Sequence, residues 1–326
     1  MNQATSVDVK TLAEGLARAD RSCVANALNL IDDKRPGAHE QALQLLTAID
    51  GERLNQGGHL IGITGPPGAG KSSLLSALLE RWCHRGLQVA VLAVDPSSPK
   101  TGGALLGDRL RMSAAGQHKN LFIRSLASRQ QLGGLAPEVW PMSRALLAGY
   151  DLVLVETVGV GQSEIDVANI VDTTVYVVQP ASGDSIQFLK SGIMEVPDIM
   201  VVNKSDLGSI ATKAANELTQ VLHRSEQHTA WQRPVCKLSA RDREGIDALE
   251  EALKAHRDHL RAQNSLTSGR MQQQVAYIIR QLNDEFGSHG IKKLGGSKQI
   301  AAHCQSLHGT GQMLASYNAW VEELRR

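Results

Sequence analysis

The 326-residue chain has no apolar run approaching the ~20 residues that span a bilayer. Its first residues, MNQATSVDVK, lack the basic and then apolar layout of a signal peptide. The formal net charge is only +1, so no overall field favours nucleic acid or an acidic membrane as a partner. We therefore expect a cytoplasmic protein that binds neither.

Cysteine is scarce as well. The four cysteines are far apart, and no two of them form a CxxC pair. This spacing argues against a disulfide framework and against a zinc site. We expect reduced, mostly buried thiols at Cys23, Cys83, Cys236 and Cys304.

Short apolar runs separated by helix-length segments dominate the middle of the chain. Such runs are apolar on both faces, which is typical of parallel strands covered by helices on both sides. We predict a doubly wound, mostly parallel α/β fold whose ligands bind at the carboxyl ends of the strands. The runs lie at residues 60–64, 89–94, 121–126, 151–157, 174–179, 198–203 and 234–239.

The flanking regions have helical periodicity and no strand pattern. We predict an N-terminal helical extension over 1–57, an α/β domain over 58–262 and a C-terminal helical arm over 263–326. The expected helices cover 7–30, 38–49, 269–288 and 296–325, with 55–58 as a linker. The last helix carries a long apolar stripe. It packs either on its own chain or on a second copy, as a dimerisation arm.

A complete phosphate-binding loop follows the first strand. The pattern G-x-x-x-x-G-K-[ST] lies between the strand at 60–64 and a helix that begins near Ser72 and Ser73. Glycines let the backbone turn its N–H groups toward phosphate oxygens, and the helix N-terminus adds positive potential. We expect Lys71 to reach the β- and γ-phosphates of a nucleotide. The loop comprises Gly65, Pro66, Pro67, Gly68, Ala69, Gly70, Lys71 and Ser72.

Two carboxylates end neighbouring strands near this loop. Asp95 follows one buried run and Glu156 ends another. With the Ser72 hydroxyl they form a candidate Mg²⁺ site, because Mg²⁺ prefers oxygen ligands and takes one or two carboxylates. A helix cap or a loop ion pair is the alternative role for each. Gly159 stands where GTPases carry the glycine that senses the γ-phosphate.

The tetrapeptide Asn203-Lys204-Ser205-Asp206 follows the strand at 198–203 and predicts guanine recognition. The Asp206 carboxylate only accepts hydrogen bonds, so it suits the two donors N1–H and N2–H of guanine. Asn203 contacts the base or holds neighbouring loops, and the stem of Lys204 lies over the ring. Ser239 and Ala240 fit the second base loop, where a backbone N–H meets the guanine O6. The cofactors we expect are therefore GTP, GDP and Mg²⁺.

Longer segments resemble the MeaB/ArgK family, the GTPase chaperones of adenosylcobalamin-dependent acyl-CoA mutases. The resemblance covers roughly residues 40–262, and the helical flanks agree with it in layout. The segments are VDPSSPKTGGALLGDRLRM (94–112), VETVGVGQSE (155–164), SGDSIQFLKSGIMEVPDI (182–199) and the NKSD loop.

The resemblance implies a SIMIBI-class P-loop GTPase that is a homodimer. It implies binding to a mutase such as methylmalonyl-CoA mutase, gating of cobalamin loading from an adenosyltransferase, and protection of the mutase. It places Asp95 near Mg²⁺ in switch I and implicates Asp108 in hydrolysis and metal binding. Lys71 and Glu156 complete the expected catalytic set, and residues 156–164 and 183–196 form further switches. Without the resemblance, Asp108 reads equally well as a solvated loop acid.

Three other functions would make different demands on the sequence. A nickel-inserting metallochaperone needs clustered soft or imidazole ligands. The eleven histidines are scattered, and we interpret the close pair His256 and His259 as a solvated helix face. A signal-recognition GTPase needs a Met-rich groove, which seven methionines do not provide. A GTP-binding switch without turnover stays open.

Overall fold

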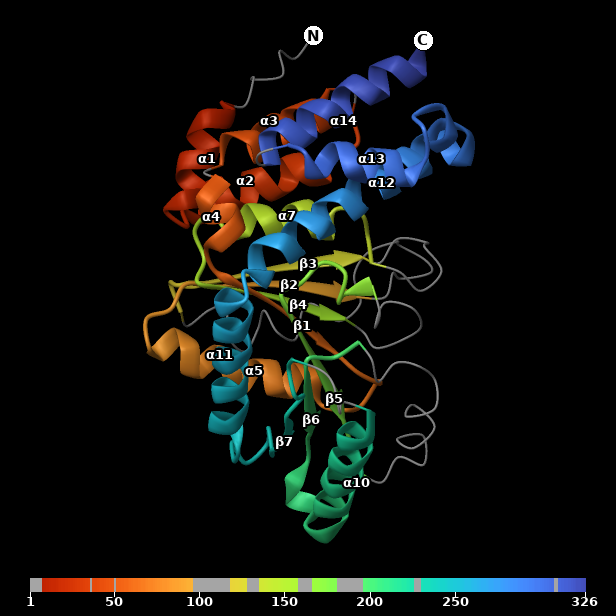
Figure 1. Ribbon diagram of the computed structural model, residues 1–326. Helices are drawn as coiled ribbons and strands as arrows, with labels where there is room; N and C mark the ends of the chain where they lie inside the picture. Colours follow the sequence, from red (N-terminus) through yellow and green to blue (C-terminus); the bar gives the residue numbers. More distant parts are fainter. Residues whose placement is uncertain are drawn as a thin grey trace, which may run out of the picture. The chain divides into compact units, whose positions relative to one another are not determined.

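Figure 1 shows the computed structural model, which describes residues 8–35, 37–49, 51–95, 118–127, 135–157, 166–180, 196–225, 230–307 and 310–326. The chain forms two compact units. The helical unit comprises Met1–Gly58, Pro137–Tyr150 and Leu266–Arg326. The sheet unit comprises His59–Ala136 and Asp151–Ser265. Each unit is described by itself.

The described part of the sheet unit is built on seven parallel strands in the order β3-β2-β4-β1-β5-β6-β7. Each strand coincides with one of the predicted apolar runs, so the predicted α/β fold is confirmed. The strands are β1 His59–Thr64, β2 Val89–Asp95, β3 Leu121–Ala127, β4 Leu152–Thr157, β5 Thr173–Val178, β6 Ile199–Val202 and β7 Val235–Lys237.

Successive side chains of a strand point to opposite faces, and both faces of this sheet carry helices. Val175 and Val177 of β5 belong to a core shared with helices α5 (Lys71–His84) and α11 (Ile246–Ala262). Tyr176 and Val178 of the same strand belong to a second core, shared with α10 (Ser209–Ser225). Burial on both faces explains why the runs are apolar throughout rather than alternating.

The central strand β1 marks the point where the strand order reverses. Strands β2, β3 and β4 lie on one side of it, and β5, β6 and β7 lie on the other. Open α/β sheets bind ligands at the carboxyl ends of the strands beside such a switch point. The loop that follows β1 therefore occupies the position most favourable for a ligand.

A buried polar network occupies the opposite, amino end of the same strands. The hydroxyl of Thr173 lies 2.7 Å from Nε2 of His59 and 2.8 Å from Nδ1 of His256. Nε2 of His256 lies 3.5 Å from the carboxylate of Asp198, whose backbone carbonyl accepts a 2.9 Å hydrogen bond from the indole of Trp231. The network ties the starts of β1, β5 and β6 to α11.

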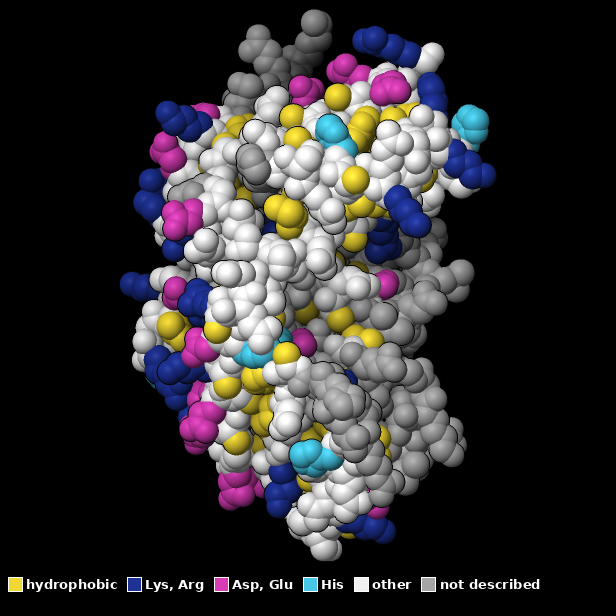
Figure 2. All heavy atoms as spheres, viewed as in Figure 1, with side chains coloured by type: hydrophobic (Ala, Val, Ile, Leu, Met, Phe, Trp, Pro, Cys, Tyr) yellow, Lys and Arg dark blue, Asp and Glu magenta, His cyan; other side chains and the backbone are white. Residues whose placement is uncertain are grey.

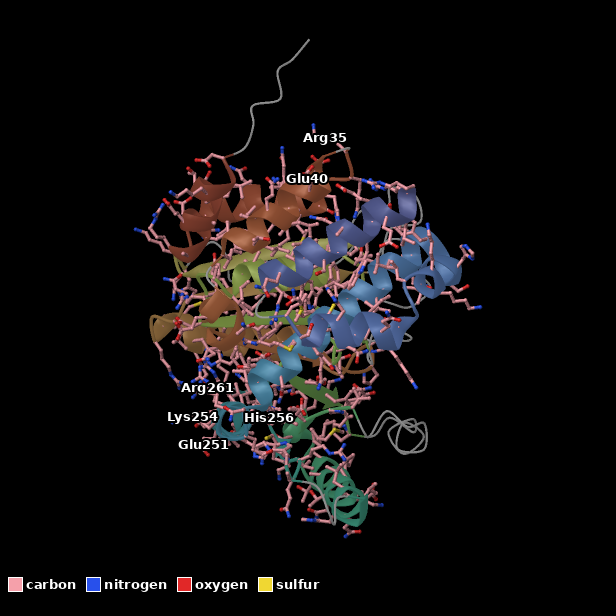
Figure 3. All side chains as sticks on the ribbon, turned by 45° about the horizontal axis from the view of Figure 1, so that its top comes forward. Arg35, Glu40, Glu251, Lys254, His256 and Arg261 are labelled. Carbon is pink, nitrogen blue, oxygen red and sulfur yellow. The ribbon has the colours of Figure 1, made fainter. Side chains whose placement is uncertain are left out.

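This network corrects the interpretation of the histidine pair. His256 is only 4% exposed, because it continues the buried face of α11 formed by Leu249 and Leu253. Figure 3 places His256 on the opposite side of α11 from the labelled Glu251 and Lys254, which are exposed. The prediction that His256 lies on a solvated face is therefore wrong, and only His259 is partly exposed.

The helical unit begins with two helices where the sequence predicts one. Helix α1 (Val9–Ala17) ends before Ala19, whose φ of 53° breaks the helical path. Asp20 then caps α2 (Arg21–Asp32) by accepting a 2.9 Å hydrogen bond from the N–H of Cys23. An aspartate at this position satisfies an N–H group that the helix itself leaves unpaired.

The remaining helices of this unit come from three separate parts of the chain. α4 replaces part of the predicted linker, and α12 is kinked at Gly287, where φ is 63°. The guanidinium of the buried Arg270 in α12 donates to the carbonyls of Leu54 (3.1 Å) and Gly57 (2.9 Å) and so holds the end of α4. The bounds are α3 Ala38–Ala48, α4 Gly51–Gln56, α7 Val139–Leu146, α12 Ser265–Lys293, α13 Ser297–Gln305 and α14 Thr310–Arg325.

The apolar stripe of α14 packs within its own chain. Tyr317 contacts His39 of α3 edge to face, with ring centroids 5.7 Å apart. Four residues of the stripe are buried without a second copy: Met313, Leu314, Tyr317 and Val321. These residues pack on their own chain, and the role of this helix in dimerisation stays a prediction.

The surface agrees with the near-zero net charge. On the face shown in Figure 2, basic and acidic side chains are interspersed rather than gathered by sign. None of the helices in the described part of the chain combines the length and the apolar character needed to cross a bilayer. The four cysteines are free thiols, and all but Cys23 are buried, as predicted.

Candidate nucleotide site

The loop between β1 and α5 has a conformation that its glycines make possible. Gly65, Gly68 and Gly70 have φ angles of 135°, 77° and 89°, a region that side-chain-bearing residues rarely adopt. A Cβ atom on Gly65 would also collide with the carbonyl oxygen of Val177 in β5. The loop therefore lies directly against the neighbouring strand, and only glycine fits at its first position.

The ammonium group of Lys71 is folded back over this loop. Its Nζ donates to the carbonyl of Gly65 at 2.7 Å and to that of Pro66 at 3.1 Å, and the residue is only 7% exposed. Gly70 precedes it and provides no side-chain cap for the first turn of α5. Positive charge and a helix N-terminus therefore converge on the concave side of the loop, which is an arrangement that binds phosphate.

The candidate metal ligands lie one strand away. Ser72 Oγ donates to Oε1 of Glu156 at 2.7 Å, across the pairing of β1 with β4. Glu156 is 7% exposed, and Asp95 ends β2, the strand on the other side of β4. The Ser72 hydroxyl and the Glu156 carboxylate are hard oxygen ligands of the kind that Mg²⁺ takes, so these two residues fit the ion. Asp108 and Gly159 lie outside the described residues.

The predicted base loop is joined to the phosphate loop by two side chains. Asn203 donates from Nδ2 to the carbonyl of Ala69 at 2.9 Å, and its Oδ1 accepts from the N–H of Ala240 at 3.1 Å. Lys204, with a φ of 58°, donates from Nζ to the carbonyl of Gly68 at 2.8 Å. Of the two roles considered for Asn203, the structure shows the one that holds neighbouring loops.

The carboxylate predicted to accept from guanine lies beside the predicted second base loop. Asp206 sits in the short 3₁₀ helix η3 (Ser205–Leu207), and its Oδ1 accepts from the Ser239 hydroxyl at 3.0 Å. The N–H of Ser205 donates to the carbonyl of Leu238 at 3.0 Å, which fixes the two loops against each other. Asp206, Ser239 and Ala240 thus lie in one place, as the motif spacing predicts.

Sequence reasoning missed three residues of this neighbourhood. Gln179, just after β5, accepts from Nζ of Lys204 at 2.5 Å. Arg241 and Asp242 follow the second base loop, and Arg241 reaches the carboxylate of Asp206 at 3.2 Å. None of the three belongs to a general nucleotide-binding pattern. The signal that could have found them is their position in the sequence, since Gln179 directly follows β5 and the other two directly follow Ala240.

Comparison with known proteins agrees with this geometry. The family model described as methylmalonyl Co-A mutase-associated GTPase MeaB matches residues 24–294. The chain belongs to the MeaB family. It is a GTPase, and membership of this family implies that it binds guanine nucleotides.

Several relatives are similar over most of their length. A probable GTPase of Mycobacterium tuberculosis is 39% identical over 280 residues, which cover 85% of this chain and 83% of the relative. The GTPase ArgK of Escherichia coli is 38% identical over 297 residues, 87% of each chain. The mouse mitochondrial methylmalonic aciduria type A homolog is 34% identical over 299 residues, which cover 86% of this chain and 71% of that protein.

A solved structure supports the fold directly. The crystal structure of a protein named LAO/AO transport system kinase superposes with a TM-score of 0.68 at 29% identity and covers 99% of both chains. That name describes the relative and not this chain. This sequence contains no kinase catalytic loop, and its NKSD segment predicts guanine recognition.

Proposed function

We propose that this MeaB-family GTPase is a nucleotide-timed chaperone of a B12-dependent acyl-CoA mutase, methylmalonyl-CoA mutase or a close relative. In this role it gates the loading of adenosylcobalamin from an adenosyltransferase and protects the mutase from inactivation. The name of the matching family supports the client, and the mouse relative is named for a disorder of methylmalonate metabolism. We propose a homodimer as the working form.

The observation that carries the proposal is the direct bonding of the base loop to the phosphate loop. Asn203 and Lys204 hydrogen-bond to carbonyls of the phosphate loop, so a change at the phosphates would be transmitted to the loop that is predicted to hold the base. A protein that times an event by GTP needs both ends of the nucleotide to act on one rigid unit. In the sequence, the predicted switch segment 156–164 begins at Glu156, and the segment 183–196 lies shortly before the predicted base loop.

Magnesium is part of the proposal. Ser72 and Glu156 would hold the ion together with Asp95 and, as the family resemblance implies, Asp108. The bound ion supplies charge neutralisation at the β- and γ-phosphates. Lys71 would bind the same oxygens, and its hydrogen bonds to the carbonyls of Gly65 and Pro66 hold its Nζ beside the loop.

The proposal is tested by phosphate release and by cobalamin loading. The purified protein is mixed with GTP and Mg²⁺, with and without an adenosylcobalamin-dependent mutase from the same host. We expect slow hydrolysis alone and faster hydrolysis with the mutase, with GTP-dependent transfer of cobalamin to the apo-mutase. Lys71→Ala is the matched control and should lose both effects.

Two results would contradict it. Phosphate release that is absent both with and without the mutase indicates a GTP-binding switch without turnover. Hydrolysis that no such mutase accelerates, together with the absence of a complex, removes the mutase as the client.

In the described part of the chain no group of three or more His, Cys, Asp or Glu side chains is placed to hold a metal ion, which disfavours the metallochaperone alternative.

A further inference from the structure

The side chain of Lys204 connects the predicted base loop to the phosphate loop. Its backbone lies in the base loop and has a φ of 58°, a left-handed conformation that is uncommon for a residue with a side chain. Its ammonium group donates to the carbonyl of Gly68 in the phosphate loop at 2.8 Å. The aliphatic stem between these two ends therefore runs from one loop to the other.

The ammonium group of Lys204 has a second partner, from a third part of the chain. Its Nζ donates to Oε1 of Gln179 at 2.5 Å. Gln179 directly follows β5, and Lys204 lies two residues beyond the end of β6, the strand that pairs with β5. Because the two strands are adjacent and parallel, residues 25 positions apart in the sequence meet at one edge of the sheet.

The two acceptors together determine where the lysine stem lies. A lysine side chain is flexible, and its ammonium is a point charge that one acceptor leaves free to swing. Here the carbonyl of Gly68 and the amide oxygen of Gln179 belong to different elements, and both hold the same nitrogen. The end of the side chain is therefore fixed in direction as well as in distance.

Glutamine supplies this second acceptor without a negative charge. An ammonium group has donors only, so the amide oxygen has to face it. A carboxylate at position 179 would accept as well, but it would place a negative charge beside the ammonium that contacts Gly68 of the phosphate loop. That charge would repel phosphate. A neutral acceptor therefore holds Lys204 and leaves its positive charge uncompensated.

We propose that Gln179 is a positioning residue for the guanine base and acts through Lys204. It holds the lysine stem in the place where the stem lies over the ring. The inference rests on the predicted base loop and adds to it a residue that belongs to neither nucleotide motif. Gln179 touches neither the base nor the phosphates in this role, so its loss weakens binding of the base and leaves binding of the phosphates unchanged.

The expected effect is moderate and is confined to ligands that carry a base. Both residues are half-buried, and the loss of one such hydrogen bond changes an equilibrium constant by about two- to tenfold. Gln179→Leu removes the acceptor at a similar side-chain size. We expect the affinity for GDP to fall by this factor. The affinity for inorganic pyrophosphate, which has phosphates and no base, should stay at the wild-type value.

The test measures how well GDP and pyrophosphate each displace fluorescently labelled GDP from the full-length protein. Gln220→Leu makes the same chemical change on the exposed surface of α10 and is the matched control. The ratio of GDP affinity to pyrophosphate affinity should fall in Gln179→Leu and stay unchanged in the control. Gln179→Ala removes the same acceptor without adding apolar surface and should repeat the result. Thermal unfolding verifies the fold of each variant.

A conservative substitution separates the acceptor from the size of the side chain. Gln179→Glu keeps an oxygen that accepts from Lys204 and adds a negative charge. The charge should weaken binding of GDP and of pyrophosphate together, so the ratio of the two affinities should stay near that of the wild-type protein. A ratio as low as that of Gln179→Leu would overturn the proposal, because the acceptor is still present.

A double substitution locates the effect on Lys204. In the Lys204→Ala background the stem is gone, so adding Gln179→Leu should not lower the affinity for GDP any further. A further loss in that background shows that Gln179 acts by another route and overturns the proposal.

Three other results are distinguishable. Equal losses of GDP and pyrophosphate affinity in Gln179→Leu show that the substitution disturbs the phosphate loop, which overturns the positioning role. An unchanged affinity for GDP also overturns it and leaves the guanine site intact. A wild-type protein that binds ADP as tightly as GDP refutes the predicted base loop itself.

Discussion

The side-chain amide of Asn203 donates to the backbone carbonyl of Ala69 across 2.9 Å, although 134 residues separate them in the chain. The same side chain accepts from the N–H of Ala240 at 3.1 Å. One buried residue therefore fixes the phosphate loop, the first base loop and the second base loop with respect to one another.

Replacing Asn203 by alanine should damage both stability and binding. The change leaves the Ala69 carbonyl and the Ala240 N–H without this partner in a buried place, which costs about 1–3 kcal/mol each where water cannot enter. We expect a lower midpoint in urea unfolding and weaker binding of GDP. Asn216→Ala, on the polar surface of α10, is a suitable control. Unchanged stability in Asn203→Ala would show that these hydrogen bonds do not hold the loops.

Asp206→Asn should change the base preference from guanine to xanthine. The amide replaces one acceptor by a donor, and xanthine presents a carbonyl where guanine presents its amino group. A polar group left unpaired in such a site costs a few kcal/mol, so the loss for GTP should be about 100-fold or more. The preference is measured by how well GDP and xanthosine diphosphate each displace a fluorescently labelled nucleotide from the protein. A retained preference for GDP would place the base elsewhere.

Glu156→Gln should separate nucleotide binding from its dependence on Mg²⁺. The amide keeps an oxygen that can accept from Ser72 but loses the charge that a metal ion requires. We expect GDP to bind without Mg²⁺ as it does to the wild-type protein. The Mg²⁺ concentration needed for hydrolysis should rise by about 10–100-fold, the range typical of weakened metal shells. A titration of Mg²⁺ against phosphate release tests this, and an unaltered midpoint would exclude Glu156 from the metal site.

The half-buried Asp198 and the buried His256 should give two opposing dependences of stability on pH. Burial raises the pKa of Asp198 from 3.8 to about 6, so folding favours its protonated form and this contribution is lost as pH rises from about 4 to 6. Burial, assisted by His259, lowers the pKa of His256 from 6.5 to about 4. Its contribution is therefore lost as pH falls from 6.5 toward 4.

Single substitutions should reveal each slope. In His256→Gln the free energy of unfolding should decrease between pH 4 and 6, and in Asp198→Asn it should increase between pH 4 and 6.5. Each change is at most about 3 kcal/mol, since each shift is about two pKa units and one unit corresponds to about 1.4 kcal/mol. Urea unfolding at several pH values measures both, with the wild-type protein nearly flat between them. Parallel slopes in the two variants would contradict the assignment.

The central strands β1, β5 and β6 were predictable from sequence because every residue of each is buried, which leaves a short and mostly apolar run on both faces. The edge strands β3 and β7 are only partly buried and include polar residues. The break near Ala19 was not predictable, since apolar residues continue at helical spacing on both sides of it and the left-handed backbone there is held by local contacts. Helix α4 was missed for the opposite reason. It has six residues and buries only Leu54.

In the site, the residues of the two nucleotide motifs were found because each motif is contiguous in sequence. Their partners are not. Gln179 meets Lys204 only because β5 and β6 are adjacent, and the burial of His256 depends on which face of α11 meets the sheet. Such relationships arise from strand order and helix rotation, which spacing along the chain does not specify.

Gly70 ends the phosphate loop, and a methyl group there would collide with the side-chain amide of Asn203. The phosphate loop and the predicted base loop are therefore packed directly against each other at Gly70 and Asn203. A substitution at Gly70 that changes phosphate binding would therefore also disturb the predicted base loop. A substitution at Asn203 would likewise disturb the phosphate loop. Substitutions at these two positions must therefore be compatible with each other.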